Sequence, residues 1–413
     1  MSSSALFPAP PPPPRRRVVQ KFGGSSVATT EKLVRVAELV VAKKRAGFDV
    51  VVVVSAQGDT TDELLAKAKA LSPEPDRREL DMLLTAGERI SMALLALAIR
   101  ERGAEAVSLT GSQSGIITTS SHSQARIIEV RPFRVEDELE LGKIVIVAGY
   151  QGVSYRREVT TLGRGGSDTT AVALAAALDA EACEIYSDVD GVYSADPRVV
   201  SDAHKLVELG YEEMQELATA GAKVLNAAAV EFAKQRGIAI YARKTGSADP
   251  GTVIRKHVPT APSGVRGLAH EAPLVFVDAP RATLASTRAT LATLERLGVA
   301  PKQVSLAVGS GLSFALSLDD VHNLGTVERE VVALLGPGTW LPDRGAVSLI
   351  GEGITKDPRH LLRALEVVPQ ATALSTSSYR ITLIVPAADT RAAVSALHQA
   401  FELGRPSTEA SLT

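Results

Sequence analysis

Residues 18–28 read VVQKFGGSSVA, and this stretch decides the interpretation of the fold. Its apolar beginning predicts a short strand, which runs into two consecutive glycines, Gly23 and Gly24. Because glycine has no Cβ, the backbone N–H groups of such a turn can approach a phosphate closely. Lys21, at the end of the strand, could offset the charge of a transferred phosphoryl group. The pattern is not a P-loop, which requires GxxxxGK followed by Ser or Thr, and an ordinary strand-to-helix turn is the alternative interpretation.

The segments that follow alternate between helical and strand character. Residues 31–45 place their apolar side chains on one helical face. Val50–Val54 is an unbroken valine run, as expected for a strand that is covered on both sides. A further buried strand is expected at Ile144–Val147, and an alanine-rich helix at Thr169–Leu178. This order predicts a largely parallel sheet between two layers of helices.

A second group of glycines, GRGGSD at residues 163–168, leads into the alanine-rich helix. The N-terminus of a helix carries a partial positive charge that favours anions. Arg164 adds a planar guanidinium group suited to a carboxylate. With the carboxylate of Asp168 close by, the motif suits a zwitterionic amino acid. The alternative is that Asp168 simply caps the helix.

A third motif, SDVDGVYSADPR at residues 187–198, follows another predicted strand. Its alternating aspartates suggest a calcium loop, but the EF-hand pattern has its glycine later in the loop and a closing glutamate. Hydroxyls, carboxylates, a tyrosine and an arginine suit the base, ribose and phosphates of a nucleotide better. A polar loop rich in turn residues is the alternative interpretation.

The pattern changes after two turn-rich stretches, at residues 247–251 and 259–264. Beyond them, residues 274–335 and 347–401 each read as strand, helix, strand, strand and helix, which is an internal repeat. Neither copy carries a concentrated set of reactive side chains, so binding or regulatory modules are expected. The expected divisions are a proline-rich disordered tail (1–16), a catalytic domain (17–258) and two small domains (270–342 and 343–413).

The composition argues against several classes of protein. Lys and Arg number 45 and Asp and Glu 47, so charge offers no case for a nucleic-acid or anionic-membrane partner, and 4% aromatic residues argue against base stacking. The single cysteine, Cys183, excludes an internal disulfide or a zinc site of several thiolates, and is expected in the core of a cytoplasmic protein. No apolar run is expected to reach the roughly 20 residues of a membrane helix.

Six collinear segments together resemble the aspartate kinase family of the amino-acid kinase fold. They are residues 18–28, 51–65, 83–91, 161–178, 184–198 and 211–225. The resemblance implies an α/β amino-acid kinase fold, with a mainly parallel sheet between helix layers, followed by two small α+β ACT-like domains. Such domains pair between subunits in the family, so the resemblance also implies a homo-oligomer.

The resemblance assigns roles to the residues that match the family's motifs. The ATP phosphates would be held by Lys21, Gly23, Gly24 and Ser25, and the rest of the nucleotide by Ser187, Asp188, Tyr193, Arg198 and Lys223. L-aspartate would be bound by Ser55, Thr61, Glu88, Arg164, Gly165, Gly166, Ser167 and Asp168. Arg164 would take the α-carboxylate, with Glu88 and Asp168 near the ammonium group; a surface position is the alternative for Glu88. Lys21, Arg164 and Asp168 form the expected catalytic set.

The reaction implied is transfer of a phosphoryl group from ATP to the side-chain carboxylate of L-aspartate, which leads to lysine, threonine, methionine and diaminopimelate. That carboxylate has a pKa of about 3.9 and is already ionised, so no general base is needed. Lys21, glycine amides and Mg²⁺ would neutralise the phosphate charge. A kinase for glutamate or N-acetylglutamate is one alternative. A non-catalytic amino-acid sensor is another, although Lys21, Arg164 and Asp168 are all present.

Several segments depart from the family's pattern. Residues 226–228 and 242–245 differ next to the expected nucleotide pocket and would alter its rim. The family has a Pro-Gly turn near the effector site of each ACT unit, but residues 278–283 contain no glycine and Arg359 stands where the second glycine would fall. The family's asparagine-containing segment is also missing at residues 298–303. We therefore expect feedback inhibition by lysine or threonine to be weakened.

Overall fold

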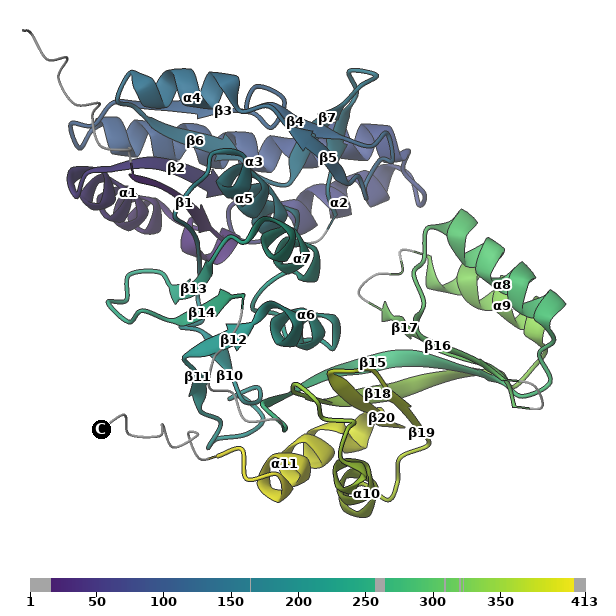
Figure 1. Cartoon of the computed structure of the whole chain (residues 1–413). Helices are drawn as coiled ribbons and strands as arrows, with labels where there is room; N and C mark the ends of the chain where they lie inside the picture. The colour runs from purple at the N-terminus through teal and green to yellow at the C-terminus, as the bar shows by residue number, and fades with distance from the viewer. Residues whose placement is uncertain are drawn as a thin grey trace, which may run out of the picture. The chain divides into compact units, whose positions relative to one another are not determined.

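The computed structural model describes residues 16–163, 165–256, 264–307, 310–318, 321 and 323–404. The chain forms two compact units, each drawn from two stretches of sequence (Figure 1). The first comprises Met1–Asp190 and Ala228–Lys256. The second comprises Gly191–Ala227 and His257–Thr413. Residues 191–227 therefore group with the C-terminal part of the chain.

The first unit is built on a sheet with the strand order β14-β13-β9-β1-β2-β6-β3. Its strands are β1 (Arg16–Phe22), β2 (Phe48–Val54), β3 (Ala106–Leu109), β6 (Ile144–Ala148), β9 (Ala182–Ser187), β13 (Ile240–Lys244) and β14 (Thr252–Arg255). Apart from the antiparallel pairing of β13 with β14, all of these neighbours run parallel. The predicted parallel sheet is confirmed, and the carboxyl ends of its parallel strands share one edge.

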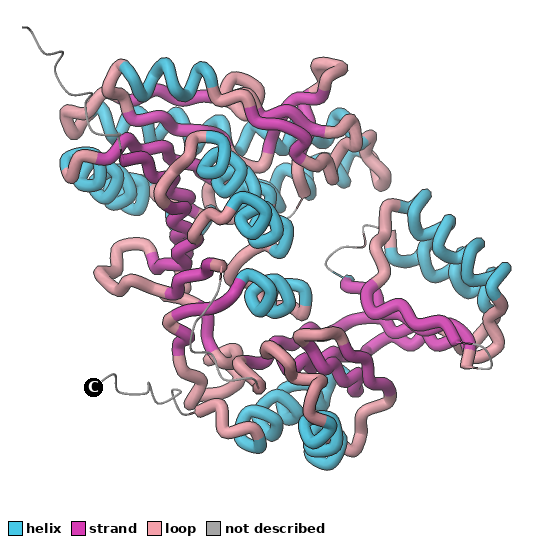
Figure 2. Tube along the Cα trace, in the orientation of Figure 1, coloured by secondary structure: helices cyan, strands magenta, loops and turns pink. Residues whose placement is uncertain are grey.

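Helices pack beside the strands of this unit (Figure 2). The helices are α1 (Thr30–Arg45), α2 (Thr60–Leu71), α3 (Arg77–Arg100), α4 (Phe133–Glu140), α5 (Gly166–Ala177) and α7 (Ala227–Arg236). Val50, Val52 and Val54 share a core with apolar residues of α1 and α3. Val51 and Val53 are equally buried and face the other side, since side chains alternate along a strand. Burial on both faces explains the unbroken valine run.

A smaller sheet of the first unit leads toward the glycines at 163–166. Its strand order is β5-β4-β7-β8. The strands are β4 (Ile116–Thr118), β5 (Ile127–Val130), β7 (Gln151–Ser154) and β8 (Val159–Thr161). A short 3₁₀ turn, η1 (Gly24–Ser26), follows β1 in the larger sheet. The smaller sheet thus holds the segment that precedes α5.

Helix α3 has the length and apolar composition of a membrane span, so the expectation that no such run exists is wrong. Half of its apolar window is buried in the structure, and Leu95 and Ile99 belong to the sheet's core. A core helix of a globular protein passes the same test. The observation is therefore weak evidence for a membrane segment.

The second unit contains an antiparallel sheet with the order β16-β17-β15-β18-β20-β19. One β-α-β-β-α copy consists of β15 (Gly267–Ala279), α8 (Leu284–Leu297), β16 (Lys302–Ala307), β17 (Gly311–Ser317) and α9 (Leu324–Leu335). The other consists of β18 (Trp340–Ile350), α10 (Pro358–Val367), β19 (Ala373–Thr376), β20 (Arg380–Pro386), the 3₁₀ turn η3 (Ala387–Asp389) and α11 (Thr390–Ala400). The predicted repeat is confirmed, and the first strands of the two copies pair with each other.

Residues 191–227 add further elements to this unit. They are β10 (Val192–Tyr193), β11 (Lys205–Leu206), β12 (Glu208–Gly210) and α6 (Tyr211–Thr219). Ala195 and Val200 lie in one hydrophobic core with Val347 of β18 and Leu397 of α11. Glu216 of α6 forms ion-pair and hydrogen-bond contacts of 2.8 Å with Arg380 and Ser377. The segment is therefore an integral part of the C-terminal unit's packing.

Candidate active site

The carboxyl edge of the parallel sheet is the candidate site. From the central strand β1 the chain continues to β2 on one side, while β9 is its neighbour on the other. Ligands of open parallel sheets bind at such a point, where the strand order reverses. Lys21 lies at the end of β1, Ser55 follows β2, and Ser187 ends β9. Three of the predicted residues thus stand at the ends of adjacent strands.

The double glycine forms a turn that packs tightly against the loop after β2. The Gly58 N–H donates to the Gly24 carbonyl at 3.1 Å, and a Cβ on Gly24 would lie 2.7 Å from the carbonyl oxygen of Ala56. Glycine is required here for close backbone approach. The Gly23 N–H already donates to the Tyr186 carbonyl at 3.1 Å. Gly24 and Ser25, at the start of η1, therefore carry the amides better placed for a phosphate.

Lys21 and Asp168 form an ion pair at this edge. Lys21 Nζ lies 2.6 Å from Asp168 Oδ1, and their side chains are only 12% and 10% exposed. Asp168 stands in the first turn of α5, but the N-cap residue is Gly165, with φ of +71°, and there is no side-chain cap bond. The interpretation of Asp168 as a helix cap is therefore wrong. The site instead holds a cation and an anion in direct contact, at the start of a helix.

The start of α5 packs against the loop that follows β6. A Cβ on Gly149 would lie 2.7 Å from Ser167 Oγ, and one on Gly166 would lie 2.7 Å from Leu162 Cβ. These contacts fix the predicted substrate residues Gly165, Gly166 and Ser167 beside the sheet edge. Arg164 lies outside the described residues.

Glu88 is a buried carboxylate of α3 that reaches the loop after β2. Its side chain accepts a hydrogen bond from the Ala56 N–H through Oε1 at 3.1 Å, while Oε2 has no hydrogen-bond partner among the residues described. Glu88 is 3% exposed, so the alternative of a surface glutamate is wrong. Burial raises the pKa of Glu88 to about 7, against the lowering effect of backbone hydrogen bonds. A buried carboxylate oxygen without a partner suits a cationic ligand group, such as an ammonium.

The other predicted residues fall into two groups. In the first unit, Ser55 and Thr61 are partly exposed, and the Ser187 hydroxyl contacts the backbone of Val189 at 3.3 to 3.4 Å. Asp188 is exposed beside it. In the second unit lie Tyr193 of β10, Arg198 and Lys223. The structure brings Lys21 and Asp168 together. Tyr193, Arg198 and Lys223 belong to the second unit.

Comparison with known proteins decides the family. A model described as the amino acid kinase family matches residues 16–243. An aspartokinase of Mycolicibacterium smegmatis is 46% identical over 396 residues, which cover 91% of this chain and 93% of that protein. The chain belongs to the aspartokinase family. An aspartokinase of Corynebacterium glutamicum is 45% identical over 400 residues, with the same two coverages.

The fold agrees with this assignment. The structure of Escherichia coli aspartokinase III in complex with aspartate and ADP superposes with a TM-score of 0.81 at 24% identity, over 94% of this chain and all of that one. The predicted amino-acid kinase fold, with additional sheet domains, is confirmed. As a member of the aspartokinase family the chain is a kinase.

Two polar networks of this aspartokinase family member were not expected from its sequence. Asp81 of α3 is fully buried and accepts hydrogen bonds from the Ser123 N–H at 3.0 Å and the Thr161 hydroxyl at 2.6 Å. It thereby holds the end of β8, just before the glycine segment of α5. Its only trace in the sequence is an acidic residue on the buried face of α3, and a single residue of this kind does not indicate a hydrogen-bond network.

The second network surrounds Glu184 of β9. Burial raises the pKa of Glu184, but Gln20 Nε2 at 2.8 Å and Lys43 Nζ at 2.9 Å outweigh this effect and lower the pKa overall. Arg243 joins the same carboxylate at 3.4 Å. The departure from the family's pattern at residues 242–245 therefore includes an arginine with a structural ion pair.

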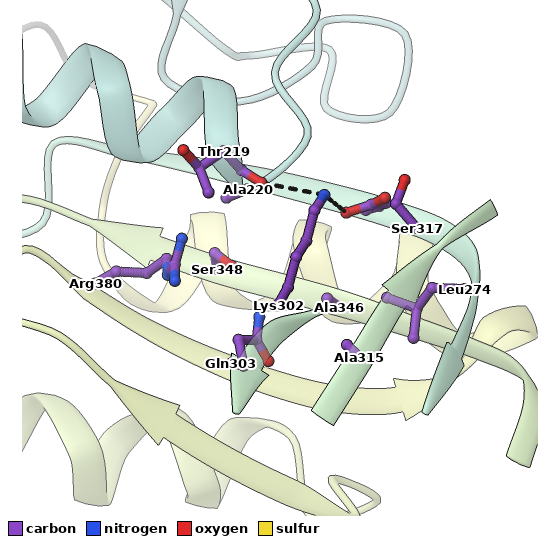
Figure 3. Close-up of a pocket in the computed structure, with 11 residues that line it drawn as sticks. Thr219, Ala220, Leu274, Lys302, Gln303, Ala315, Ser317, Ala346, Ser348 and Arg380 are labelled. Carbon is purple, nitrogen blue, oxygen red and sulfur yellow. Dashed lines mark hydrogen bonds and ion pairs between the residues drawn. The ribbon is translucent and has the colours of Figure 1, made fainter. Parts of the chain in front are cut away.

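A cavity in the second unit can be set aside as a substrate site. It holds only about 10 Å³, roughly one water molecule, beside Lys302 of β16. Lys302 Nζ lies 2.8 Å from a carboxylate oxygen of Glu271 and 3.5 Å from the Thr219 carbonyl oxygen. Figure 3 shows Lys302 beside Thr219 and Ala220. The cavity therefore lies where the Lys302–Glu271 ion pair connects the sheet to the end of α6.

We expect Glu88→Gln to change the pH dependence of stability. The pKa of about 7 in the folded protein exceeds the ordinary value of 4.5, so the folded state binds more protons between these values. The contribution of Glu88 to stability is full below about pH 4.5 and is lost as the pH rises to about 7. Glutamine keeps the shape and the bond from Ala56 but does not ionise. Relative to the parent, the variant should gain at most about 3 kcal/mol across this window.

Urea unfolding of the unliganded proteins at several pH values measures this gain. Glu63→Gln, at an exposed position in α2, is the matched control and should show no such pH-dependent difference. Parallel pH curves for the parent and Glu88→Gln would contradict the assignment of an ionisable, destabilising carboxylate.

Proposed function

We propose that the protein is an aspartate kinase, which converts ATP and L-aspartate to ADP and 4-phospho-L-aspartate. The observation that carries this proposal is the Lys21–Asp168 pair at the strand-order switch point, together with the unpartnered oxygen of Glu88. Lys21 supplies a cation for a phosphoryl group, and the carboxylates supply partners for an ammonium group. An identity of 45 to 46% with aspartokinases over 91% of this chain supports aspartate as the acceptor.

The chemistry needs charge control more than proton transfer. The acceptor carboxylate is ionised at neutral pH, so it attacks the γ-phosphorus directly and ADP leaves. The main obstacle is repulsion between two anionic reactants. The substrate ammonium takes Asp168 as its partner, which leaves the Lys21 ammonium free to stabilise the transferring phosphoryl group. Arg164 holds the α-carboxylate, and the Gly24 and Ser25 amides face the phosphates.

Mg²⁺ fits this site as a companion of the nucleotide. The described part of the chain contains no group of three or more His, Cys, Asp and Glu side chains placed to hold a metal. Mg²⁺ in kinases is commonly held by substrate phosphates with one or two carboxylates, so no dedicated protein cage is needed. Asp188, exposed just after β9, is a carboxylate that could share the ion while Asp168 pairs with the ammonium group, and the ion would neutralise phosphate charge.

The remaining assignments follow the same proposal. Ser187, Asp188, Tyr193, Arg198 and Lys223 bind the rest of the nucleotide, and Gly23 shapes the phosphate turn. Residues 17–258 carry the catalytic residues, although 191–227 pack with the C-terminal unit, and ACT-like domains follow at 270–342 and 343–413, through which subunits pair. The confirmed repeat supports this division. The tail at 1–16 lies almost wholly outside the described residues. We place the enzyme in the cytoplasm, at the first step toward lysine, threonine, methionine and diaminopimelate.

A coupled assay for ADP release tests the function. L-aspartate, L-glutamate and N-acetylglutamate are supplied in parallel, each with ATP and Mg²⁺. Turnover with aspartate alone is the expected result. Turnover with another acid would move the protein to a different acceptor, and no turnover with any acid would favour a non-catalytic sensor.

Arg164→Lys is expected to weaken aspartate binding more than ATP binding. A lysine ammonium is a point charge and cannot reproduce two parallel hydrogen bonds to a carboxylate. The KM for aspartate should rise about tenfold or more, as for loss of a charge-assisted hydrogen bond. Both KM values are measured by varying each substrate in turn. An effect confined to the KM for ATP would mean that the arginine binds a different anion.

The second ACT-like turn supports weakened feedback inhibition. Asp357 caps α10 by accepting the Arg359 N–H at 2.9 Å, and the Arg359 guanidinium binds the same carboxylate at 2.7 to 3.0 Å. These hydrogen bonds hold the pKa of Asp357 at about 2. At least one of the amides at this helix start is already occupied, so an effector carboxylate would have to displace Asp357.

We therefore expect lysine and threonine, alone or together at millimolar levels, to leave the rate within about twofold of its uninhibited value, because little coupling energy is available. Activity is measured at subsaturating aspartate, and thermal stability with and without each amino acid. Strong inhibition, or a clear rise in melting temperature with either amino acid, would show that an effector site persists without the turn glycines.

A further inference from the structure

Ser194 is a fully buried residue between two of the proposed nucleotide contacts, and every polar group it has is bonded. Its N–H donates to the His204 carbonyl at 2.9 Å, and its carbonyl accepts the Leu268 N–H of β15 at 2.7 Å. Its hydroxyl oxygen accepts the His204 N–H at 3.1 Å. The same hydroxyl lies 3.0 Å from Nε2 of His398, in the last helix. Three distant parts of the second unit therefore meet at this serine.

The bonding pattern favours one chemical state of His398. The Ser194 oxygen already accepts one N–H, so its hydroxyl proton can be donated to Nε2 of a neutral imidazole. The other ring nitrogen, Nδ1, then carries the hydrogen and faces Asp202 Oδ1 at 3.6 Å. His398 is 1% exposed, and burial lowers its pKa, which agrees with a neutral ring. In this tautomer Nε2 of His398 accepts the hydroxyl proton of Ser194.

Serine, histidine and aspartate in this order are the residue types of a nucleophilic triad, but burial excludes that chemistry. Ser194 is 0% and His398 1% exposed, so no substrate can reach either side chain. An attacking group must lie within about 3.5 Å of the bond it attacks. The arrangement must therefore act on the protein's own structure.

The residues just after α11 contact residues 202–204 at two further places. The Leu403 carbonyl lies 2.7 Å from Nδ1 of His204. A Cβ on Gly404 would lie 2.5 Å from Asp202 Oδ2, so the backbone after α11 runs close to Asp202. Asp202 and His204 lie in the loop between β10 and β11, just before Lys205, which pairs with Tyr193. Helix α11 and the residues after it thus contact residues 194–204 through the His398 side chain, the Leu403 carbonyl and the backbone at Gly404.

We propose that His398 is a positioning residue for nucleotide binding, which acts through Ser194 on the neighbouring Tyr193 and Arg198. The inference rests on the proposed function, because the role of Tyr193 and Arg198 toward ATP is part of it. Arg198 is itself oriented by Asp196, whose carboxylate it binds at 2.8 and 3.0 Å. Fixing the backbone at 194 positions the adjacent Tyr193 and the start of the loop that carries Asp196 and Arg198. ATP affinity then depends on a residue that lies 204 positions along the chain from the loop it holds.

The test compares His398→Leu, His398→Gln and Ser194→Ala in the full-length enzyme. Leucine removes the acceptor at similar size, while glutamine can still accept from the Ser194 hydroxyl. We expect His398→Leu and Ser194→Ala each to raise the KM for ATP about tenfold, as for loss of a buried hydrogen bond, with the KM for aspartate within about twofold. His398→Gln should recover most of the loss. The double variant should be no worse than the worse single variant, since both remove one interaction.

His360→Leu is the matched control. His360 is a partly buried histidine of α10 in the same repeat, bonded to the Ile354 carbonyl at 2.9 Å. It should lower thermal stability without changing the KM for ATP. Calorimetric titration of ATP into each variant gives the affinity independently of turnover. If the parent binds ATP but does not phosphorylate aspartate, the proposed function fails while this measurement still decides the inference.

The inference is overturned if His398→Leu and Ser194→Ala bind ATP as the parent does, or if both KM values rise together. It is also overturned if His398→Gln is no better than His398→Leu. If His398→Leu fails to fold, Ser194→Ala alone decides, because removal of one hydroxyl leaves the surrounding core intact.

Discussion

Lys21→Ala is expected to lower kcat at least about 100-fold while the circular dichroism spectrum stays unchanged. Lys21 lies at the end of the central strand, with its ammonium 2.6 Å from Asp168. Its charge is needed most where negative charge develops on the transferring phosphoryl group, so the loss should appear in kcat more than in either KM. Asp168 would lose its ion-pair partner, so a modest fall in melting temperature is also expected.

The matched control for this variant is Lys44→Ala. Lys44 forms an ion pair of similar chemistry with Asp49, at 3.1 Å, near the opposite end of β2. Its loss should leave kcat within about twofold of the parent, since a partly exposed ion pair contributes little. A near-normal kcat for Lys21→Ala would remove Lys21 from the catalytic set and with it the proposed mechanism.

Asp168→Asn is expected to reduce kcat/KM for aspartate about 100-fold or more, with a smaller effect on the KM for ATP. Asparagine keeps the shape but cannot pair with an ammonium group as a carboxylate does. The variant therefore loses a partner for the substrate and leaves Lys21 without its counter-charge in the free enzyme. Steady-state kinetics with each substrate varied separate the two effects.

Asp49→Asn serves as control, because it removes the same charge from the other Lys–Asp pair of this sheet. Kinetics are expressed per folded molecule, so that any loss of stability is not counted as lost catalysis. Equal falls in kcat/KM for Asp168→Asn and Asp49→Asn would assign Asp168 a purely structural role. The double variant with Lys21→Ala should show strong non-additivity, as expected for side chains in contact.

Local motifs were the part of the site that the sequence could predict. The strand that ends in Gly23 and Gly24 places Lys21 at the sheet edge, because strand length and turn position are properties of neighbouring residues. The repeat in the C-terminal half was equally visible, since each copy keeps its own periodicity. The unbroken valines of β2 likewise indicated a strand covered on both faces.

Tertiary contacts were the part it could not predict. Aspartate near the start of a helix is typical of a cap. Asp168 of α5 instead pairs with Lys21 of β1, a contact that the local sequence does not indicate. Glu88 is buried because the loop after β2 folds over α3. The approach is so close that a Cβ added to Gly87 would lie 2.7 Å from the Cβ of Ala56. The contact between Ser194 and His398 spans 204 positions and leaves no periodic signal.

Because residues 191–227 pack with the C-terminal unit, the two units cannot be divided at one point in the sequence. These residues interrupt the first unit in sequence, but Ala195 and Val200 lie in a core built mainly from residues after 264. A chain shortened after Lys256 would keep this segment and expose its apolar side chains to water. Truncation at one position therefore cannot yield the first unit alone. Chimeras that exchange the C-terminal unit between relatives should fold only when residues 191–227 are exchanged with it.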